Sequence, residues 1–205
     1  MNILVVAATE AEIRPSIAFL QKRSIPFLIS GVGMLAAVYT LTKSLQTNKP
    51  DLVIQVGIGG GLDNEEELGK VYQIVEDEIF AFGAEDHDDF LPIAALGFGK
   101  GHFSQKLPAK PFAMPDVPQR RGITVNKVHG SEKSIEQLRQ IYRGPIVESM
   151  EGVAAFFVAT QENVPVLQFR ATSNYIEPRN RDAWQIGPAI KNLNLFLQEL
   201  LKSLS

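Results

Sequence analysis

The chain has no cysteine, which excludes disulfide bonds and thiolate chemistry and removes the usual ligand of structural zinc. It has no apolar stretch near the roughly 20 residues of a membrane-spanning helix, and no basic segment precedes its first apolar run. Lysine and arginine form no long run, and the formal net charge is -3. We therefore expect a small-molecule ligand, a cytoplasmic location, and neither a nucleic-acid nor a membrane partner.

Apolar residues make up 45% of the 205 residues, which is typical of a well-packed globular chain. No repeat, low-complexity tract or linker divides the chain, so we expect a single domain over residues 1–205. The acidic cluster around His87 shows no regular ligand spacing, and the sequence identifies no partner for His102 or His129. We predict no metal and no cofactor.

The first third of the chain predicts three buried strands, each followed by glycines or carboxylates. Ile3 to Ala8 is an apolar, β-branched run, and Thr9 to Glu12 follows it with two carboxylates at a helix start. Pro26 to Ser30 predicts a short strand, and Gly31 to Gly33 then opens an Ala-rich helix. Asp51 to Val56 predicts a third strand, which we expect Gly57 to Gly61 to end.

The remainder alternates strand and helix patterns around a poorly periodic segment, Ala84 to Pro118. The expected elements are one or two strands in Val71 to Phe82, a strand in Gly122 to Val128, helices in Ser134 to Ile141 and Glu148 to Ala159, a strand in Val164 to Thr172, and a last helix capped by Asp182, with an apolar stripe of Ile186, Ile190, Leu193, Leu197, Leu200 and Leu201.

This order predicts an α/β fold, a three-layer sandwich with a central mixed β-sheet that curls toward a barrel. Ligands in open α/β sheets bind at the carboxyl ends of the strands, so segments distant in sequence converge there. We expect five segments to meet in one site: residues 9–12, 31–33, 57–61, 148–151 and 170–174.

The same five segments resemble a known family. Five motifs are similar, in order and spacing, to motifs of the nucleoside phosphorylase and nucleosidase superfamily. They are the Glu-rich turn, Ser30-Gly31-Val32-Gly33, Gly59-Gly60-Gly61-Leu62, Val147-Glu148-Ser149-Met150-Glu151-Gly152 and Arg170-Ala171-Thr172-Ser173-Asn174. The likeness covers nearly the whole chain and is greatest to the futalosine hydrolases and the methylthioadenosine/S-adenosylhomocysteine nucleosidases. It is poor in residues 84–118.

The resemblance implies roles for individual residues. Glu12 would be the base that orients a water at the anomeric carbon, and Met150 and Glu151 would hold the ribose. A carboxylate suits this chemistry, because cleavage of an N-glycosidic bond builds positive charge on the sugar. An alternative for Glu12 is a helix N-terminal acid that favours the dipole, and Glu10 is a substitute base two residues away.

The glycine loops bear on the nucleophile. Gly59 and Gly60 would let the substrate approach the backbone, and Arg170 and Ser173 complete the predicted substrate-binding set. Related phosphorylases carry arginine and hydroxyl groups for phosphate in these loops, whereas Gln55 to Gly61 offers no Arg, Lys, Ser or Thr and Gly31 to Met34 offers no cation. Water is therefore the expected nucleophile, although backbone amides also bind anions.

Asn174 points to the base of the substrate. Adenine-specific nucleosidases have at this position an aspartic acid that protonates the purine, and an Asn amide supplies no proton at neutral pH. A 6-oxopurine presents two acceptors, O6 and N7, that one NH2 group satisfies. The alternative is an Asn that only stabilises a turn.

The resemblance to futalosine hydrolases continues through Tyr175 to Arg181 and Trp184. These enzymes release hypoxanthine from futalosine in a menaquinone route, and futalosine carries a benzoate for which Arg179 or Arg181 is a suitable partner. The alternative is that both arginines only face solvent. We thus predict a futalosine-type nucleoside hydrolase that forms a homo-oligomer. The alternatives are a methylthioadenosine/S-adenosylhomocysteine nucleosidase and an inactive nucleoside-binding protein.

Overall fold

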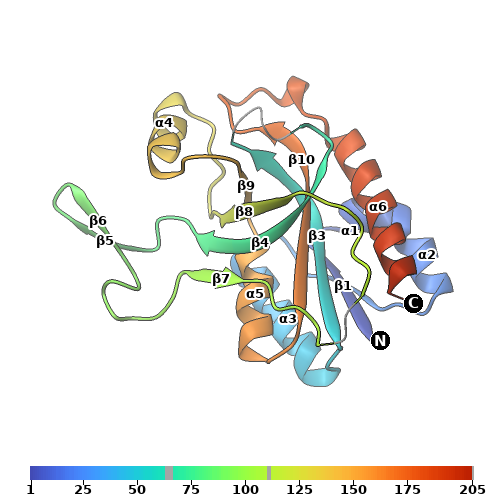
Figure 1. The fold of residues 1–205 in the computed structure, drawn as a ribbon. Coiled ribbons are helices and arrows are strands. Elements are labelled where there is room, and N and C mark those ends of the chain that lie inside the picture. Colours follow the sequence, from blue (N-terminus) through green and yellow to red (C-terminus); the bar gives the residue numbers. More distant parts are fainter. Residues whose placement is uncertain (63–66, 110–111, 205) are drawn as a thin grey trace.

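The structure is a computed structural model that describes residues 1–62, 67–109 and 112–204. Within these residues an eight-stranded mixed sheet runs in the order β10-β4-β8-β9-β3-β1-β2, with β7 beside β4 (Figure 1). Its strands are β1 (Ile3–Ala7), β2 (Phe27–Ile29), β3 (Leu52–Gly61), β4 (Val71–Ile79), β7 (His102–Ser104), β8 (Gln119–Thr124), β9 (Ile146–Ser149) and β10 (Val166–Tyr175).

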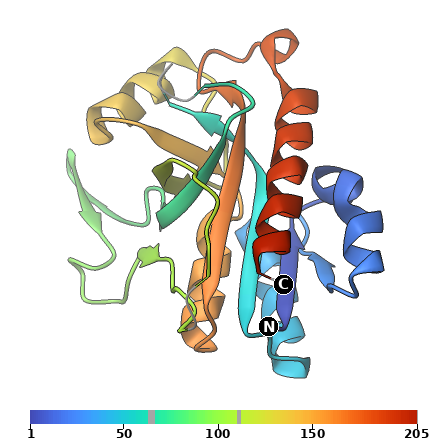
Figure 2. The same ribbon diagram turned by 45° about the vertical axis from the view of Figure 1, so that its right-hand side comes forward.

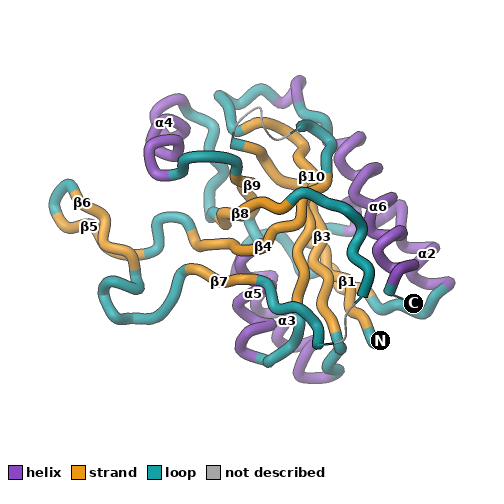
Figure 3. The backbone as a smooth tube through the Cα atoms, viewed as in Figure 1, coloured by secondary structure: helices purple, strands orange, loops and turns teal. Residues whose placement is uncertain are grey.

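Helices cover both faces of the sheet, which confirms the predicted α/β class with a central mixed sheet (Figures 2 and 3). On one face lie α1 (Glu10–Ile13), α2 (Ile17–Lys22) and α6 (Ile186–Ser203), and on the other lie α3 (Met34–Thr47) and α5 (Gly152–Gln161). A further helix, α4 (Glu132–Ile141), stands at one end of the sheet, and Ser131 caps it through a bond from the Ser134 amide. Short 3-10 turns occupy Arg14–Ser16 and Arg181–Ala183.

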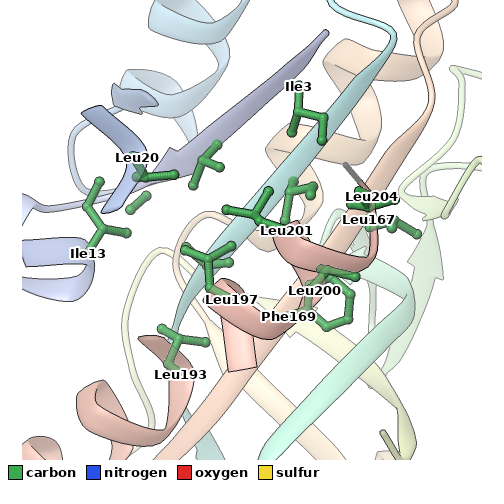
Figure 4. Close-up of a cluster of buried hydrophobic side chains, with 14 of the residues drawn as sticks. Ile3, Ile13, Leu20, Leu167, Phe169, Leu193, Leu197, Leu200, Leu201 and Leu204 are labelled. Carbon is green, nitrogen blue, oxygen red and sulfur yellow. The ribbon is translucent and has the colours of Figure 1, made fainter. Parts of the chain in front are cut away.

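The core under α6 shows why the last helix packs where it does. Leu193, Leu197, Leu200 and Leu201 recur at helical spacing, and all four are buried against β1, β3 and β10 (Figure 4). They contact apolar residues of the strands and of the first helices, such as Ile3, Ile13, Leu20, Leu167 and Phe169. The first two residues of the predicted stripe differ, because Ile186 and Ile190 line a cavity instead.

Five strands of the sheet close into a ring. β3 pairs in parallel with β10 and antiparallel with β9, while β10–β4, β4–β8 and β8–β9 complete the circuit. The predicted curl toward a barrel is therefore confirmed. β1 extends the sheet beyond the ring as a parallel neighbour of β3, and β2 pairs in parallel with the outer edge of β1.

Two predicted boundaries near the ring are wrong. β3 does not end at Val56 but continues to Gly61, since β10 and β9 hydrogen-bond with its last residues. The expected helix over Glu148 to Ala159 starts only at Gly152, because Ile146–Ser149 forms β9 and Glu151 takes the N-cap position. The four-residue strand lies only two residues before the helix, and a pattern this short does not distinguish a strand from the first turn of a helix.

Other differences concern the termini of elements. Asp182 does not cap the last helix, which begins at Ile186 with Gln185 as its N-cap. β10 continues past Thr172 to Tyr175, so Ser173 and Asn174 are strand residues. The segment from Ala84 to Pro118 contains β7 and a separate hairpin of β5 (Gly83–Asp86) and β6 (Asp89–Pro92), which projects away from the sheet (Figure 1). Residues 110–111 of that segment lie outside the described residues.

No helix among the described residues combines the length and apolar composition that a bilayer crossing requires.

Candidate active site

A cavity of about 320 Å³ lies at the carboxyl ends of β1, β3, β9 and β10. Its walls come from all five segments that the sequence predicted to converge, and Gly59, Gly60, Met150, Ser173 and Asn174 are among them. Glu12, Glu151 and Arg179 also line it, whereas Arg170 and Arg181 are not among its lining residues in the described part of the chain. The ring of strands therefore gathers ten catalytic and binding candidates at one edge, eight of them in contact with one cavity.

Glu12 is held in place by three donors. Its Oε2 accepts hydrogen bonds from the Thr9 amide at 2.9 Å and the Thr9 hydroxyl at 3.1 Å, and its Oε1 accepts one from the Ile58 amide at 3.1 Å. The bond from the Thr9 amide is part of a capping box at the start of α1, so the helix-terminal role and the position in the cavity wall coexist. Glu10 instead forms an exposed ion pair with Arg14 at 3.3 Å.

Glu151 is fixed from both sides of its carboxylate. Its Oε1 accepts a hydrogen bond of 2.8 Å from the Gly33 amide, where a φ of 91° requires glycine. Its Oε2 lies 4.0 Å from Nη1 of Arg170, whose side chain is only 1% exposed. Arg170 therefore lies behind Glu151 and orients its carboxylate, while Glu151 itself faces the cavity.

A buried polar chain that sequence reasoning missed supports Arg170. The Arg170 Nε donates to Oε1 of Gln168 at 3.0 Å, and Nε2 of Gln168 donates to Oδ2 of Asp77 at 3.2 Å. The Thr124 hydroxyl donates to Oδ1 of Asp77 at 2.8 Å. Polar residues inside the otherwise apolar strands β4 and β10 were the available signal, since buried polar groups are normally paired.

Burial dominates the electrostatics of Asp77. Removal from water raises its pKa from 3.8 to about 7, against the opposing effects of the Thr124 and Gln168 hydrogen bonds and of the Arg170 charge. Its surroundings leave no spare room, because a Cβ on Gly152 would lie 2.0 Å from Oδ2.

Asn174 has a defined orientation in the cavity wall. Its Oδ1 accepts a hydrogen bond of 2.8 Å from the Ser173 hydroxyl, and its Nδ2 donates one of 2.9 Å to the Tyr175 carbonyl. The Ser173 hydroxyl also lies 3.2 Å from the Gly59 carbonyl. One hydrogen of the Asn174 amide is left for a ligand, since an NH2 group has two donors.

His129 and Glu148 form a pair that the sequence did not reveal. The Glu148 carboxylate contacts Nδ1 of His129 and accepts a 3.2 Å hydrogen bond from its amide, and both side chains are 5% exposed. Burial raises the pKa of Glu148, while the hydrogen bonds from His129 oppose that rise. Both residues line the cavity, and the edge of Phe80 packs on the imidazole with ring centres 4.8 Å apart.

The two arginines nominated for a substrate carboxylate share one aromatic neighbour. The guanidinium of Arg179 lies 5.4 Å from the centre of the Trp184 ring, and that of Arg181 lies 6.0 Å from it. Arg179 and Trp184 line the cavity, and Arg181 does not belong to its lining among the described residues. The geometry thus favours Arg179 over Arg181 as a ligand contact.

Comparison with known proteins identifies the class. The family model of the phosphorylase superfamily matches residues 17–204, and the chain belongs to this superfamily. Futalosine hydrolase of Streptomyces coelicolor is 37% identical over 175 residues, which cover 81% of this chain and 74% of that protein. The 5'-methylthioadenosine/S-adenosylhomocysteine nucleosidase of Tolumonas auensis is 27% identical over 85% of this chain and 80% of its own.

A solved structure agrees with the fold. The native structure of futalosine hydrolase of Helicobacter pylori has a TM-score of 0.80 at 13% identity, over 98% of this chain and 97% of that one. The family model and the sequence relatives identify the chain as an N-glycosyl hydrolase. The structural match shows that it has the fold of these enzymes.

The perturbed carboxyl of Asp77 predicts a pH dependence of stability. Its folded-state pKa of about 7 lies above the ordinary 3.8, so the folded protein holds this proton more tightly than the unfolded chain. The contribution to the free energy of unfolding is full below pH 4 and is lost as the pH rises to 7, at up to about 1.4 kcal/mol per pH unit. The free energy of unfolding, measured by urea denaturation at several pH values in this range, should fall less steeply with pH for Asp77→Asn than for the wild type.

The exposed Asp116→Asn serves as the matched control and should keep the wild-type slope. Equal slopes for Asp77→Asn and the wild type would contradict the assignment, whatever the absolute stability of the variant.

Proposed function

We propose that this N-glycosyl hydrolase cleaves futalosine to hypoxanthine and dehypoxanthine futalosine, a step of menaquinone biosynthesis. The observation that carries the proposal is the Asn174 amide, which Ser173 and Tyr175 orient in the cavity wall with one hydrogen left for a ligand. The 37% identity to the futalosine hydrolase of Streptomyces coelicolor supports the same substrate.

The carboxylates account for the bond cleavage. A water in the cavity attacks the anomeric carbon and gives its proton to Glu12, whose Oε1 accepts only one hydrogen bond and keeps a lone pair for it. Positive charge that develops on the sugar is stabilised by Glu12 and Glu151. Glu151 accepts the ribose hydroxyls, with Gly33 and Arg170 fixing the direction of its carboxylate. Met150 packs against the sugar.

Asn174 accounts for the base. Its free N–H donates to O6 or N7 of hypoxanthine, both of which are acceptors. Adenine has a 6-amino donor where hypoxanthine has O6. This donor would face the N–H of Asn174, so one of the two donors would lack an acceptor. An unpaired polar group in a closed site lowers the affinity for the ligand. Gly60 leaves room beside the amide, since a Cβ there would lie 3.1 Å from Nδ2 of Asn174.

Water is the favoured nucleophile over phosphate. Arg179 is the only arginine or lysine among the described residues that line the cavity. The imidazole of His129 is paired with Glu148, and the nearby Arg170 is buried behind Glu151. A phosphate dianion beside Glu12 and Glu151 would meet two carboxylates without a dedicated counter-charge. Retention of both carboxylates in the cavity also argues against an inactive binding protein, because binding alone needs no base.

A methylthioadenosine/S-adenosylhomocysteine nucleosidase is the second candidate. The 27% identity to the enzyme of Tolumonas auensis favours it. The amide at residue 174 opposes it, because the free N–H of Asn174 would face the 6-amino donor of adenine and one of the two donors would lack an acceptor.

A homo-oligomer and a cytosolic location stay predictions. An exposed apolar stripe at the start of α3 supports the oligomer: Val32, Leu35 and Tyr39 are 58%, 88% and 68% exposed and follow one another at helical spacing. Val32 also lines the cavity, so a second copy on this stripe would stand at the mouth of the site.

Purified protein incubated with futalosine, inosine, methylthioadenosine and S-adenosylhomocysteine, with and without phosphate, tests the proposal by chromatography of the released base. We expect hypoxanthine from futalosine at a rate independent of phosphate. Adenine release would establish the second candidate, and phosphate dependence would exclude a hydrolase.

Replacement of Glu12 by Gln should lower kcat for hypoxanthine release by roughly 10²- to 10⁴-fold, the usual contribution of a general base. Glu10→Gln, an exposed carboxylate of the same helix, should leave kcat within about threefold of the wild type. Thermal melting of both variants checks that the fold persists. A Glu12→Gln variant with near wild-type kcat would exclude Glu12 as the base.

Arg179→Ala should raise KM for futalosine by roughly 10- to 100-fold with little change in kcat, because a charge-assisted hydrogen bond to the benzoate is worth about 1.5–3 kcal/mol. Arg181→Ala is the matched control on the same Trp184 ring and should leave KM nearly unchanged. Steady-state kinetics of both variants decide the assignment, and an increase in KM confined to Arg181→Ala would reverse it.

A further inference from the structure

The reaction proposed above leaves one proton without a donor. When the glycosidic bond of a purine nucleoside breaks, the base takes both bonding electrons and leaves more easily if one of its ring nitrogens is protonated. The amide of Asn174 has no proton to transfer at neutral pH. This inference rests on the proposed function and concerns the group that supplies the proton.

Gly60 places two walls of the cavity opposite each other. In the register of the sheet, Gly60 of β3 pairs with Glu148 of β9 on one side and with Asn174 of β10 on the other. Paired residues of neighbouring strands project to the same face, and neighbouring strands lie about 4.8 Å apart. Glu148 and Asn174 therefore lie on either side of Gly60, which forms a cavity floor without a side chain. The Cα atoms of Glu148 and Asn174 are about 10 Å apart by this spacing, which leaves room for a flat base.

His129 stands on the Glu148 side of this floor. Nδ1 of its ring contacts the Glu148 carboxylate, which also accepts the His129 amide at 3.2 Å, so both the ring and the backbone are fixed. Both hydrogen bonds of His129 to described residues are made through its amide and Nδ1, which leaves Nε2 for a ligand of the cavity that His129 lines. The carboxylate beside Nδ1 fixes the orientation of the ring, and His129 is one of the residues that line the cavity.

The other titratable groups of the cavity have different positions or tasks. Glu12 receives the proton of the water, and Glu151 is occupied by Gly33 and Arg170. Arginine stays protonated in proteins and does not transfer a proton to the base. The titratable groups around His129 are Glu148 beside it, Tyr142 behind Phe80, and, across the cavity, Glu12, Glu151, Tyr175, Glu177 and Arg179.

We propose that His129, held by Glu148, is the catalytic acid that protonates the departing purine. The bond between C1′ and N9 breaks with both electrons on the base, and the proton of Nε2 passes to a ring nitrogen of the purine. Water gives its oxygen to C1′ and its proton to Glu12. Exchange of protons with solvent then returns Glu12 to the carboxylate and His129 to the imidazolium, so no other reactant is consumed.

A substrate that needs no acid tests this role. Methylation of N7 gives the base a positive charge, so N7-methylfutalosine releases a neutral base without protonation. His129→Gln should lower kcat for futalosine by at least roughly 100-fold, as expected for loss of a general acid. The same variant should hydrolyse N7-methylfutalosine with kcat within about threefold of the wild type. The measured quantity is kcat, because methylation also alters the contact with Asn174 and hence KM.

His102→Gln is the matched control, since His102 pairs with Glu76 at 3.2 Å in an exposed position on β7 and β4. It should leave kcat for both substrates unchanged. Glu148→Gln preserves a hydrogen-bond acceptor and removes the carboxylate, so it should lower kcat for futalosine and leave kcat for N7-methylfutalosine within about threefold of the wild type. These two variants separate the chemistry of the pair from its contribution to folding.

Equal losses of kcat for the two substrates in His129→Gln, or a raised KM with unchanged kcat, would overturn the acid role. Equal losses of kcat for the two substrates in Glu148→Gln would overturn the part assigned to the carboxylate. A wild-type protein that releases no hypoxanthine from futalosine would overturn the proposed function, and the acid role with it, before any variant is compared.

Discussion

The close approach of other groups to the glycines of β3 is the constraint on which the site depends. A Cβ on Gly57 would lie 2.1 Å from Nη1 of Arg170 and 2.9 Å from Oε1 of Glu12. A Cβ on Gly59 would lie 2.7 Å from the Glu148 carbonyl. Because these positions carry no side chain, β3 pairs with β9 and β10 at once, and the buried arginine and the two cavity carboxylates come within reach of one another.

The sequence predicted the elements whose residues follow a local pattern of burial or spacing. The buried run of β1, the glycine turn before α3 and the leucine stripe of α6 each combine burial with a fixed period, so the sequence indicated them and the place where they meet. The end of β3 and the start of α5 were misplaced because pairing across the sheet, and not a change of composition, decides where they lie.

Contacts between distant residues escaped prediction for a different reason. Glu148 lies 19 residues from His129, and Gln168 lies 91 residues from Asp77, so no motif of fixed spacing joins either pair. Only the pairing of β9 with β8, which His129 follows, and the pairing of β10 with β4 bring them together. The buried polar side chains in β4 and β10 signalled that a network exists, but the sequence did not identify its members.

The closed ring of strands determines at what point during its synthesis the protein can become active. β3 carries the floor of the cavity, yet its longest pairing is with β10, whose residues Val166 to Tyr175 leave the ribosome more than 100 residues later. Contacts of such large sequence separation form slowly and late. A nascent chain that ends before β10 holds Glu12 and the β3 glycines but lacks the Asn174 wall for the base, so catalytic competence arrives only with the last strand.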